Sequence, residues 1–151
     1  MLLALIVWIG GIIFFSFVLA PTVFSVLPSR ELAGSVVSPS LQRLHWMGLA
    51  SGVIFLVCSL LHNRMKHAQF RAFACEHVLV VLMLGITAFS HFAITPRMLE
   101  LRREMVVVDD VPRSDPRRVE FNRRHVWSTR CEGTVFFMGL VVVGCTARRF
   151  K

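Results

Sequence analysis

The sequence lacks charged side chains over four long stretches, although its net charge is +8. These stretches are 1–29, 44–63, 77–96 and 133–147. A bilayer core about 30 Å thick needs roughly 20 helical residues at about 1.5 Å each, so the first three stretches are long enough to cross it. The fourth is too short unless Glu132 and Arg130 lie in or near the membrane. The sequence therefore predicts an integral membrane protein with four transmembrane helices, and its apolar fraction of 55% supports this.

The sequence also lacks the motifs of a zinc-binding or catalytic domain. It has four cysteines but no Cys-x-x-Cys pair, which argues against a zinc site and a disulfide framework. We find no nucleophile–base motif, no phosphate-binding loop and no paired carboxylates, so we expect no enzymatic activity. The basic residues lie between and beside the apolar stretches, where they would anchor helices at lipid phosphates. We therefore expect the lipid bilayer, and not nucleic acid, as the partner of these charges.

The predicted fold is all-α, a single domain over 1–151 that forms a four-helix transmembrane bundle. The expected helices cover about 2–27, 39–66, 73–95 and 116–147. The first should be retained and not cleaved as a signal peptide, because no basic residue precedes it and Pro21 directly follows the cleavage-like Ala20. Residues 30–37 are predicted to form a separate interfacial piece, with Pro39 in the first turn of the second helix.

The third loop, 97–124, is dense in charges of both signs. Their helical spacing indicates that helices three and four extend beyond the membrane as a charged hairpin. Pro96 would kink or end the third helix, and Asp115 with Pro116 would begin the fourth. A disordered charged loop is the alternative. Loops one and three hold more Lys and Arg than loop two and the C-terminus, so they should be cytoplasmic, with both termini outside a bacterial plasma membrane.

Two pairs of glycines predict close packing between helices. Gly48 and Gly52 form a GxxxG motif in the second helix, in which small residues at i and i+4 let two backbones approach. Gly10 and Gly11 lie in the first helix, where neighbouring helices would compensate for their weak helix propensity. These residues predict association between helices but no chemistry.

The histidines fall into two layers of an up–down bundle. His45, His91 and His125 lie on the side of loops one and three, on three different helices. The opposite side holds His62, His67 and His77. Three imidazoles at one depth could bind a haem or a metal ion. The alternative is that these amphipathic histidines, which lie near helix ends, contact only the lipid headgroup region.

Arg130 and Glu132 are the remaining ionisable residues at the start of a predicted span. Charges inside a membrane are costly and usually face a partner or a cavity. Residues two positions apart on a helix point to different faces, so these two cannot simply pair with each other. Glu132 needs a partner such as Arg97 or a histidine. The two charges could fix the fourth helix in place, or they could line a substrate or proton pathway.

Several short motifs follow one another along nearly the whole chain. They are Trp8-Ile9-Gly10-Gly11 with Phe14-Phe15, Pro21-Thr22-Val23-Phe24 with Leu27, Ala33-Gly34, Thr95-Pro96-Arg97-Met98 with Leu101-Arg102, and Phe121 to His125. In order and spacing they resemble the transmembrane-protein-205-like family (domain of unknown function 4149). The resemblance implies a small four-helix membrane protein and no settled activity.

One segment departs from the pattern of that family. Its members usually carry an asparagine a few residues after the last helix's histidine and serine, whereas 128–132 reads Ser-Thr-Arg-Cys-Glu here. A function that depends on that asparagine would be lost in this chain. The Trp-x-Gly-Gly start is also similar to that of small four-helix proteins of copper import and late haem synthesis, which favours haem or metal binding by analogy only.

Three classes of function follow from these features. The first is an accessory or structural subunit that packs against a larger membrane protein complex. The GxxxG motif and the absence of catalytic motifs support this class. The second is a haem- or metal-binding protein that uses His45, His91 and His125. The third is a small-solute or ion permease that works around Arg130 and Glu132.

Overall fold

The computed structural model describes residues 1–65, 75–105 and 108–148, which are helical apart from short turns and contain no strand. Four of its helical rods are long and apolar enough to cross a membrane, which confirms the predicted all-α fold of four membrane-capable helices. The elements are α1 (Leu2–Phe14), the π-helical turn η1 (Phe15–Leu19), α2 (Ala20–Val26), α3 (Arg30–Met65), α4 (Cys75–Phe89), the π-helical turn η2 (Ser90–Ile94), α5 (Thr95–Met105), the short 3₁₀ turn η3 (Val108–Asp110) and α6 (Pro116–Arg148).

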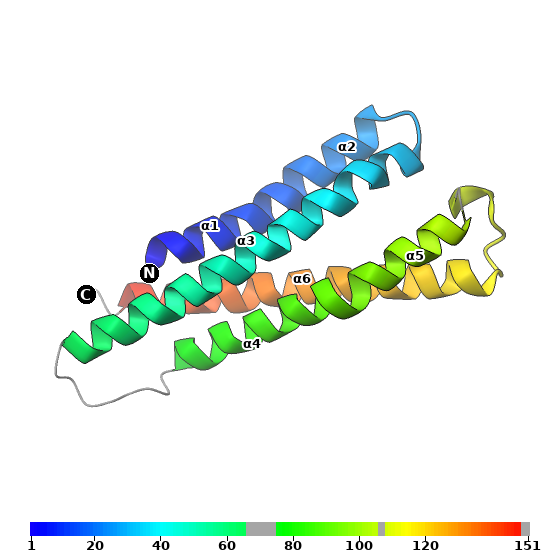
Figure 1. The fold of residues 1–151 in the computed structure, drawn as a ribbon. Helices are drawn as coiled ribbons and strands as arrows, with labels where there is room; N and C mark the ends of the chain where they lie inside the picture. The colour runs from blue at the N-terminus through cyan, green and yellow to red at the C-terminus, as the bar shows by residue number, and fades with distance from the viewer. Residues whose placement is uncertain (66–74, 106–107, 149–151) are drawn as a thin grey trace.

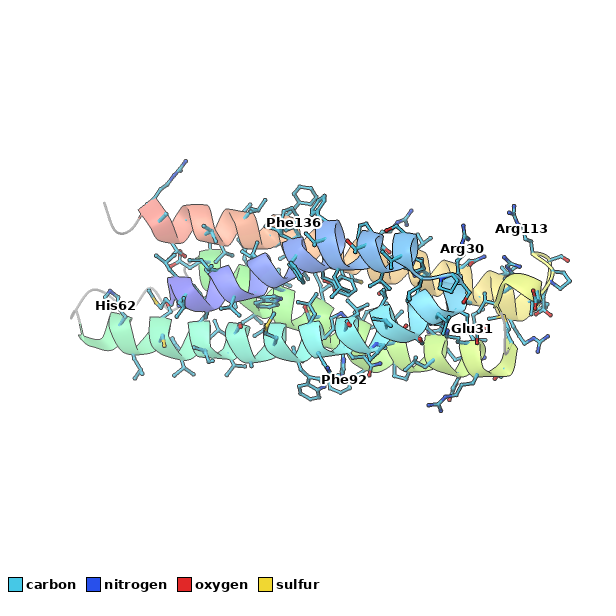
Figure 2. The ribbon with its side chains drawn as sticks, turned by 90° about the horizontal axis from the view of Figure 1, so that it is seen from above. Arg30, Glu31, His62, Phe92, Arg113 and Phe136 are labelled. Atoms are coloured by element: carbon cyan, nitrogen blue, oxygen red, sulfur yellow. The ribbon has the colours of Figure 1, made fainter. Side chains whose placement is uncertain are left out.

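The rods form an up–down bundle. The rod of α1, η1 and α2 runs antiparallel to α3, and the rod of α4, η2 and α5 runs antiparallel to α6 (Figure 1). The N-terminus and the C-terminal end of α6 lie at one end of the bundle, and the α2–α3 and α5–α6 turns lie at the other. Figure 2 shows His62 near the first end, and Arg30, Glu31 and Arg113 at the second. We call these the terminal end and the hairpin end.

The core of the bundle is apolar and receives side chains from every rod. Its buried members are Leu5, Trp8, Ile9 and Ile12 from α1, Leu44 and Phe55 from α3, Val80 and Met83 from α4, and Val135 and Val142 from α6. The outer faces are apolar as well: Leu3, Phe17 and Val26 are each more than 70% exposed. A water-soluble helix shows a polar outer face, so these surfaces require the hydrocarbon of a bilayer around them.

The second helix begins at Arg30 and not at Pro39, so the separate interfacial piece predicted over 30–37 is wrong. Ser29 caps the helix, since its Oγ accepts the Leu32 N–H at 3.1 Å. Pro39 lies inside the helix with its ring exposed. Tertiary contacts hold this first part in place, because Arg102 of α5 packs its guanidinium over Gly34 and donates to the Glu31 carbonyl at 2.7 Å.

Two other prolines lie in rods that continue through them. Pro21 and Pro96 each lie two residues after the end of a π-helical turn, η1 and η2 respectively. A proline ring ordinarily clashes with the carbonyl four residues earlier, and that residue lies inside the π turn in both cases. The wider turn makes room for the ring. At η2, the Thr95 hydroxyl donates to the Ser90 carbonyl at 3.0 Å, which satisfies an acceptor in the widened turn. The third helix therefore continues past its predicted end at Thr95 to Met105.

α5 and the first half of α6 carry the charges of the third loop. Glu120 binds Arg97 at 3.2 Å and Arg124 at 2.9 Å, which ties α5 to α6. Asp115 caps α6, as its position before a proline predicts, and accepts the Arg117 N–H at 2.8 Å. The side chain of Arg117 also binds this carboxylate and lowers the pKa of Asp115 to about 2. The predicted ends of helices two and three at Lys66 and Phe73 fall outside the residues that the structure describes.

Candidate functional site

A histidine and a glutamate from two different helices are in direct contact inside the bundle. His45 of α3 is 1% exposed, and its Nε2 lies 2.6 Å from Oε1 of Glu132 of α6, which is 16% exposed. The contact needs one proton between the two atoms. Either Nε2–H donates to a carboxylate, or a protonated carboxyl donates to Nε2. The pair is therefore a proton-binding site at a place where charge is costly.

His91 completes this cluster from η2, the π-helical turn that follows α4. Its ring meets that of His45 edge to face, with centroids 5.6 Å apart. Trp46 and Phe92 lie against the outer side of His91, at 5.1 and 4.7 Å between centroids. Among the residues that the structure describes, Nδ1 of His45 and Nδ1 of His91 are buried without a hydrogen-bond partner. We call His45, His91 and Glu132 the His45 layer.

His125 does not join this layer, which corrects the predicted set of three histidines. Its side chain is exposed, and α6 contributes Glu132 to the layer in its place. The edge-to-face contact of the other two rings leaves no room for a haem plane between them. Over the described parts of the chain, no three His, Cys, Asp or Glu side chains are grouped to hold a metal ion.

The other predicted charge, Arg130, points away from the layer. It is exposed on the outside of α6, with its guanidinium carbon 5.7 Å from the Trp127 ring centroid. Two positions on a helix correspond to roughly 200° of rotation, so an inward Glu132 sends Arg130 outward. Of the two partners expected for Glu132, the structure shows a histidine, whereas Arg97 binds Glu100 and Glu120.

A second group of polar side chains lies toward the terminal end. His77 of α4 is buried, and its Nε2 lies 2.9 Å from the hydroxyl oxygen of Ser59 of α3. Thr146 of α6 is 1% exposed. The His77 Nδ1 and the Thr146 hydroxyl are buried with no hydrogen-bond partner among the described residues. We call Ser59, His77 and Thr146 the His77 layer.

The two layers repeat each other on the same three helices. In α3, in the rod of α4 and η2, and in α6, the member of one layer lies fourteen residues from the member of the other: His45 and Ser59, His91 and His77, Glu132 and Thr146. Fourteen residues rise about 21 Å and return to nearly the same helix face. Thr146 therefore lies at about the depth of His77, and the bundle buries one polar layer toward each of its ends.

Between the layers, the apolar side chains of Trp8, Ile9 and Met83 pack against glycines, among them the two of the predicted GxxxG motif. We call these three side chains the apolar plug. Ideal Cβ atoms on Gly48 and Gly52 would meet the indole of Trp8, and one on Gly139 would lie 2.9 Å from Ile9. The GxxxG motif thus makes room for a tryptophan inside the chain. Gly11 is equally tight, since its Cβ would lie 2.5 Å from the Met47 methyl group. The matching position on Gly10 has nothing within 4 Å, so this glycine makes no close contact.

The sequence interpretation overlooked the His77 layer as a site. Its signal in the sequence was the fourteen-residue spacing of His77 and His91, which recurs on two other helices. Ser59 and Thr146 gave no reason for attention because single hydroxyl residues in apolar helices are common packing residues. His67 falls outside the described residues, and His62 is half-buried near the terminal end.

Comparison with known proteins gives one match. No curated protein and no solved structure matches the sequence. The family model described as "Domain of unknown function (DUF4149)" matches residues 3–106. This range runs from the second residue of α1 through α5, and it includes Trp8 with Gly48 and Gly52 and the contact between Gly34 and Arg102. Since the match covers more than half of the chain, the protein belongs to the DUF4149 family.

Proposed function

We propose that this chain is a small proton- or ion-translocating membrane protein, and that the His45–Glu132 pair is its proton-binding site. The observation that carries the proposal is the 2.6 Å contact between Nε2 and Oε1, made between α3 and α6 by a buried histidine and a partly buried glutamate. An ionisable residue inside a membrane bundle faces a partner or a pathway. Histidine suits a pathway because it exchanges protons between pH 5 and 8.

The surroundings of the His45–Glu132 pair favour a role in proton transfer over a purely structural contact. A structural pair would be best with all its nitrogens bonded, yet Nδ1 of His45 and Nδ1 of His91 have no partner in the described structure. These nitrogens carry no competing hydrogen bond, so in the proposed cycle each takes up or releases a proton once water or a solute reaches it. Glu132 keeps some exposure, at 16%, and gives the pair a route to solvent.

The two layers and the plug correspond to a closed conformation of such a protein. Protons would bind at the His45 layer from the hairpin end and at the His77 layer from the terminal end. Between the layers, Trp8, Ile9 and Met83 fill the bundle against Gly52 and Gly139. Translocation then requires the plug to move or to admit water. In this proposal the hairpin of α5 and α6 extends into the cytoplasm of a bacterial cell, because basic residues favour that side.

Proton flux into liposomes tests this proposal. The purified protein is reconstituted with a pH-sensitive dye inside, and a potassium gradient with valinomycin supplies the driving force. The wild-type protein should acidify the lumen faster than empty liposomes do. Glu132→Gln keeps the size and hydrogen-bonding capacity of the side chain but cannot hold the charge, so its rate should fall to that of empty liposomes. Glu100→Gln is the matched control, since Glu100 is a 62% exposed carboxylate bound to Arg97.

Two outcomes would contradict the proposal. One is a wild-type rate equal to that of empty liposomes over a range of pH. The other is an unchanged rate in Glu132→Gln, which would make the pair a structural contact between α3 and α6.

A second candidate is an accessory subunit of a larger membrane complex, without catalytic activity of its own. The observation in its favour is a set of outward glycines. Gly10, Gly85 and Gly144 are exposed on α1, α4 and α6, with nothing within 4 Å of an ideal Cβ. Such positions let a helix of another protein approach closely. Under this candidate, Gly85→Leu would abolish co-purification of a partner from native membranes, whereas Val81→Leu on the same exposed face would not.

We also place the chain in the transmembrane-protein-205-like branch of its family as a proposal. Its support is that motifs far apart in sequence meet in the fold. Trp8 of the first motif packs on Gly48 and Gly52, and Gly34 packs under the guanidinium of Arg102. Residues that touch each other must be matched in size, which explains why they would occur together in related chains.

A further inference from the structure

α6 carries a stripe of two arginines and a tryptophan on its outer face. Arg123, Trp127 and Arg130 are spaced by four and three residues, which places them within one narrow arc of the helix. All three side chains are exposed, and the guanidinium of Arg130 lies over the Trp127 ring at 5.7 Å. Glu132 is roughly opposite this arc and turned into the bundle. We call these three residues the α6 stripe.

The arginines of the stripe have no acidic partner in the described part of the chain. Neither Arg123 nor Arg130 forms an ion pair with a residue that the structure describes, whereas Arg97, Arg117 and Arg124 each do. An unpaired guanidinium on the outside of a membrane helix is costly unless an anion reaches it.

The depth of the stripe in the membrane follows from the exposed aromatic residues. Trp46 and Phe92 are 57% and 61% exposed, next to His45 and His91 of the His45 layer, and Figure 2 shows Phe92 on the outside of the bundle. Trp127 is 53% exposed on α6, about one turn from that layer. Exposed tryptophans gather at the headgroup level of a bilayer. Aromatic residues on separate faces therefore mark one membrane interface, and Arg130 lies at it.

We propose that the α6 stripe binds the headgroup of an anionic phospholipid, of the phosphatidylglycerol type. Phosphate oxygens accept the paired N–H groups of arginine with good geometry. In this arrangement Arg130 binds the phosphate, and Arg123 donates to the glycerol hydroxyls of the headgroup. The Trp127 ring lies between them and covers the start of the acyl chains. Zwitterionic phosphatidylcholine binds more weakly, because its choline group repels the second arginine.

The test is native mass spectrometry of the protein in mixed micelles. Phosphatidylglycerol and phosphatidylcholine with identical acyl chains are supplied at equal concentration, and the bound lipids are counted. The wild-type protein should prefer phosphatidylglycerol. Arg130→Gln and Arg123→Gln should each weaken this preference about five-fold, as expected for loss of one arginine at an anionic surface. The control is Arg113→Gln, an exposed arginine at the hairpin tip outside the stripe, which should change nothing.

Further measurements distinguish a lipid headgroup from free phosphate as the source of the anion, and they provide a second variant in case the first does not fold. Arg130→Lys retains the charge and should retain a preference for phosphatidylglycerol. Millimolar inorganic phosphate should not displace the lipid; complete displacement would show a site for free phosphate instead. Equal loss in Arg113→Gln and Arg130→Gln, or no preference in the wild-type protein, would overturn the proposal. If Arg130→Gln does not yield a helical, monodisperse protein, Arg123→Gln decides in the same way.

Discussion

Replacing Gly48 by alanine would place a methyl group against the indole of Trp8. The new Cβ would lie 2.8 Å from Cε2 and 2.9 Å from Cδ1 of that ring, and closer still to Nε1. Trp8 is 1% exposed and is held on its other side by the core, so the rigid ring cannot rotate away. Overpacking of this kind costs about 1–3 kcal/mol. Alanine also favours a helix over glycine by about 1 kcal/mol, which offsets part of the cost.

Two other glycines provide a graded comparison in which the helix-propensity gain is the same. Gly10→Ala meets nothing within 4 Å and should be neutral or slightly stabilising. Gly11→Ala meets the terminal methyl groups of Met47 at 2.5 Å and Leu44 at 2.8 Å, which can turn aside. We therefore expect the free energy of unfolding to fall most in Gly48→Ala, less in Gly11→Ala and not at all in Gly10→Ala. The difference between the first and the last should be about 1–3 kcal/mol.

The measurement is unfolding in mixed micelles of dodecylmaltoside and sodium dodecyl sulfate, followed by far-ultraviolet circular dichroism. Trp8 fluorescence, in a variant without the other two tryptophans, reports on the contact itself. Equal midpoints for Gly48→Ala and Gly10→Ala would refute the reasoning, because they would mean that the indole does not fill the space above the GxxxG motif.

Three more predictions concern the hairpin end and the membrane topology. Arg102→Ala removes the bond to the Glu31 carbonyl and uncovers Gly34, and it should lower the free energy of unfolding by about 1.5–3 kcal/mol in the same mixed-micelle titration. Asp115 has a folded pKa of about 2 against 3.8 as its ordinary value, so its bond with Arg117 stabilises the protein above about pH 4 and is lost as the pH falls through 2; the difference in denaturation midpoint between the wild-type protein and Asp115→Asn should shrink over that window. In a background without native cysteines, Ser114→Cys and Leu2→Cys should react with a membrane-impermeant thiol reagent from opposite sides of sealed vesicles; labelling of both from one side would exclude four spans.

The four spans could be predicted because the apolar character of successive residues adds up over the length of a membrane helix. Long uncharged stretches such as 44–63 leave few alternatives to a membrane helix, and no tertiary contact is needed to recognise them. The cap at Asp115 was predictable for a similar reason, since an acceptor followed by a proline satisfies a helix start locally. These features are decided by neighbouring residues alone.

The continuation of helices through prolines could not be predicted, since it depends on distant contacts. Pro39 reads as a helix start, but the turns before it are held by Arg102 from a segment far along the chain. Pro96 reads as a helix end, but a π turn admits its ring. The sequence contains no local signal for that wider turn.

The candidate site could be predicted only in part, because it also depends on how distant helices pack together. Depth along a span follows from counting, so His45 and His91 were correctly placed at one level. The face toward which each residue points depends on how each helix is rotated in the bundle. For α6 that rotation brings Glu132 inward and leaves His125 exposed. Counting alone could not distinguish these two residues.

The π turn η2 has a consequence for how the chain tolerates changes in length. A π turn holds one residue more than the α-helical turn that would replace it, so the segment after it is rotated by about 100° relative to a regular helix. Deleting one residue within Ser90–Ile94 would replace the π turn by an α-helical turn and leave α5 facing as it does. Winding all the same residues as a regular α-helix would instead turn α5 by that angle. Arg97 would then leave Glu120, and Arg102 would leave Gly34. The rotational setting of α5 thus depends on the π turn that accommodates the extra residue, some distance from the contacts that it aligns.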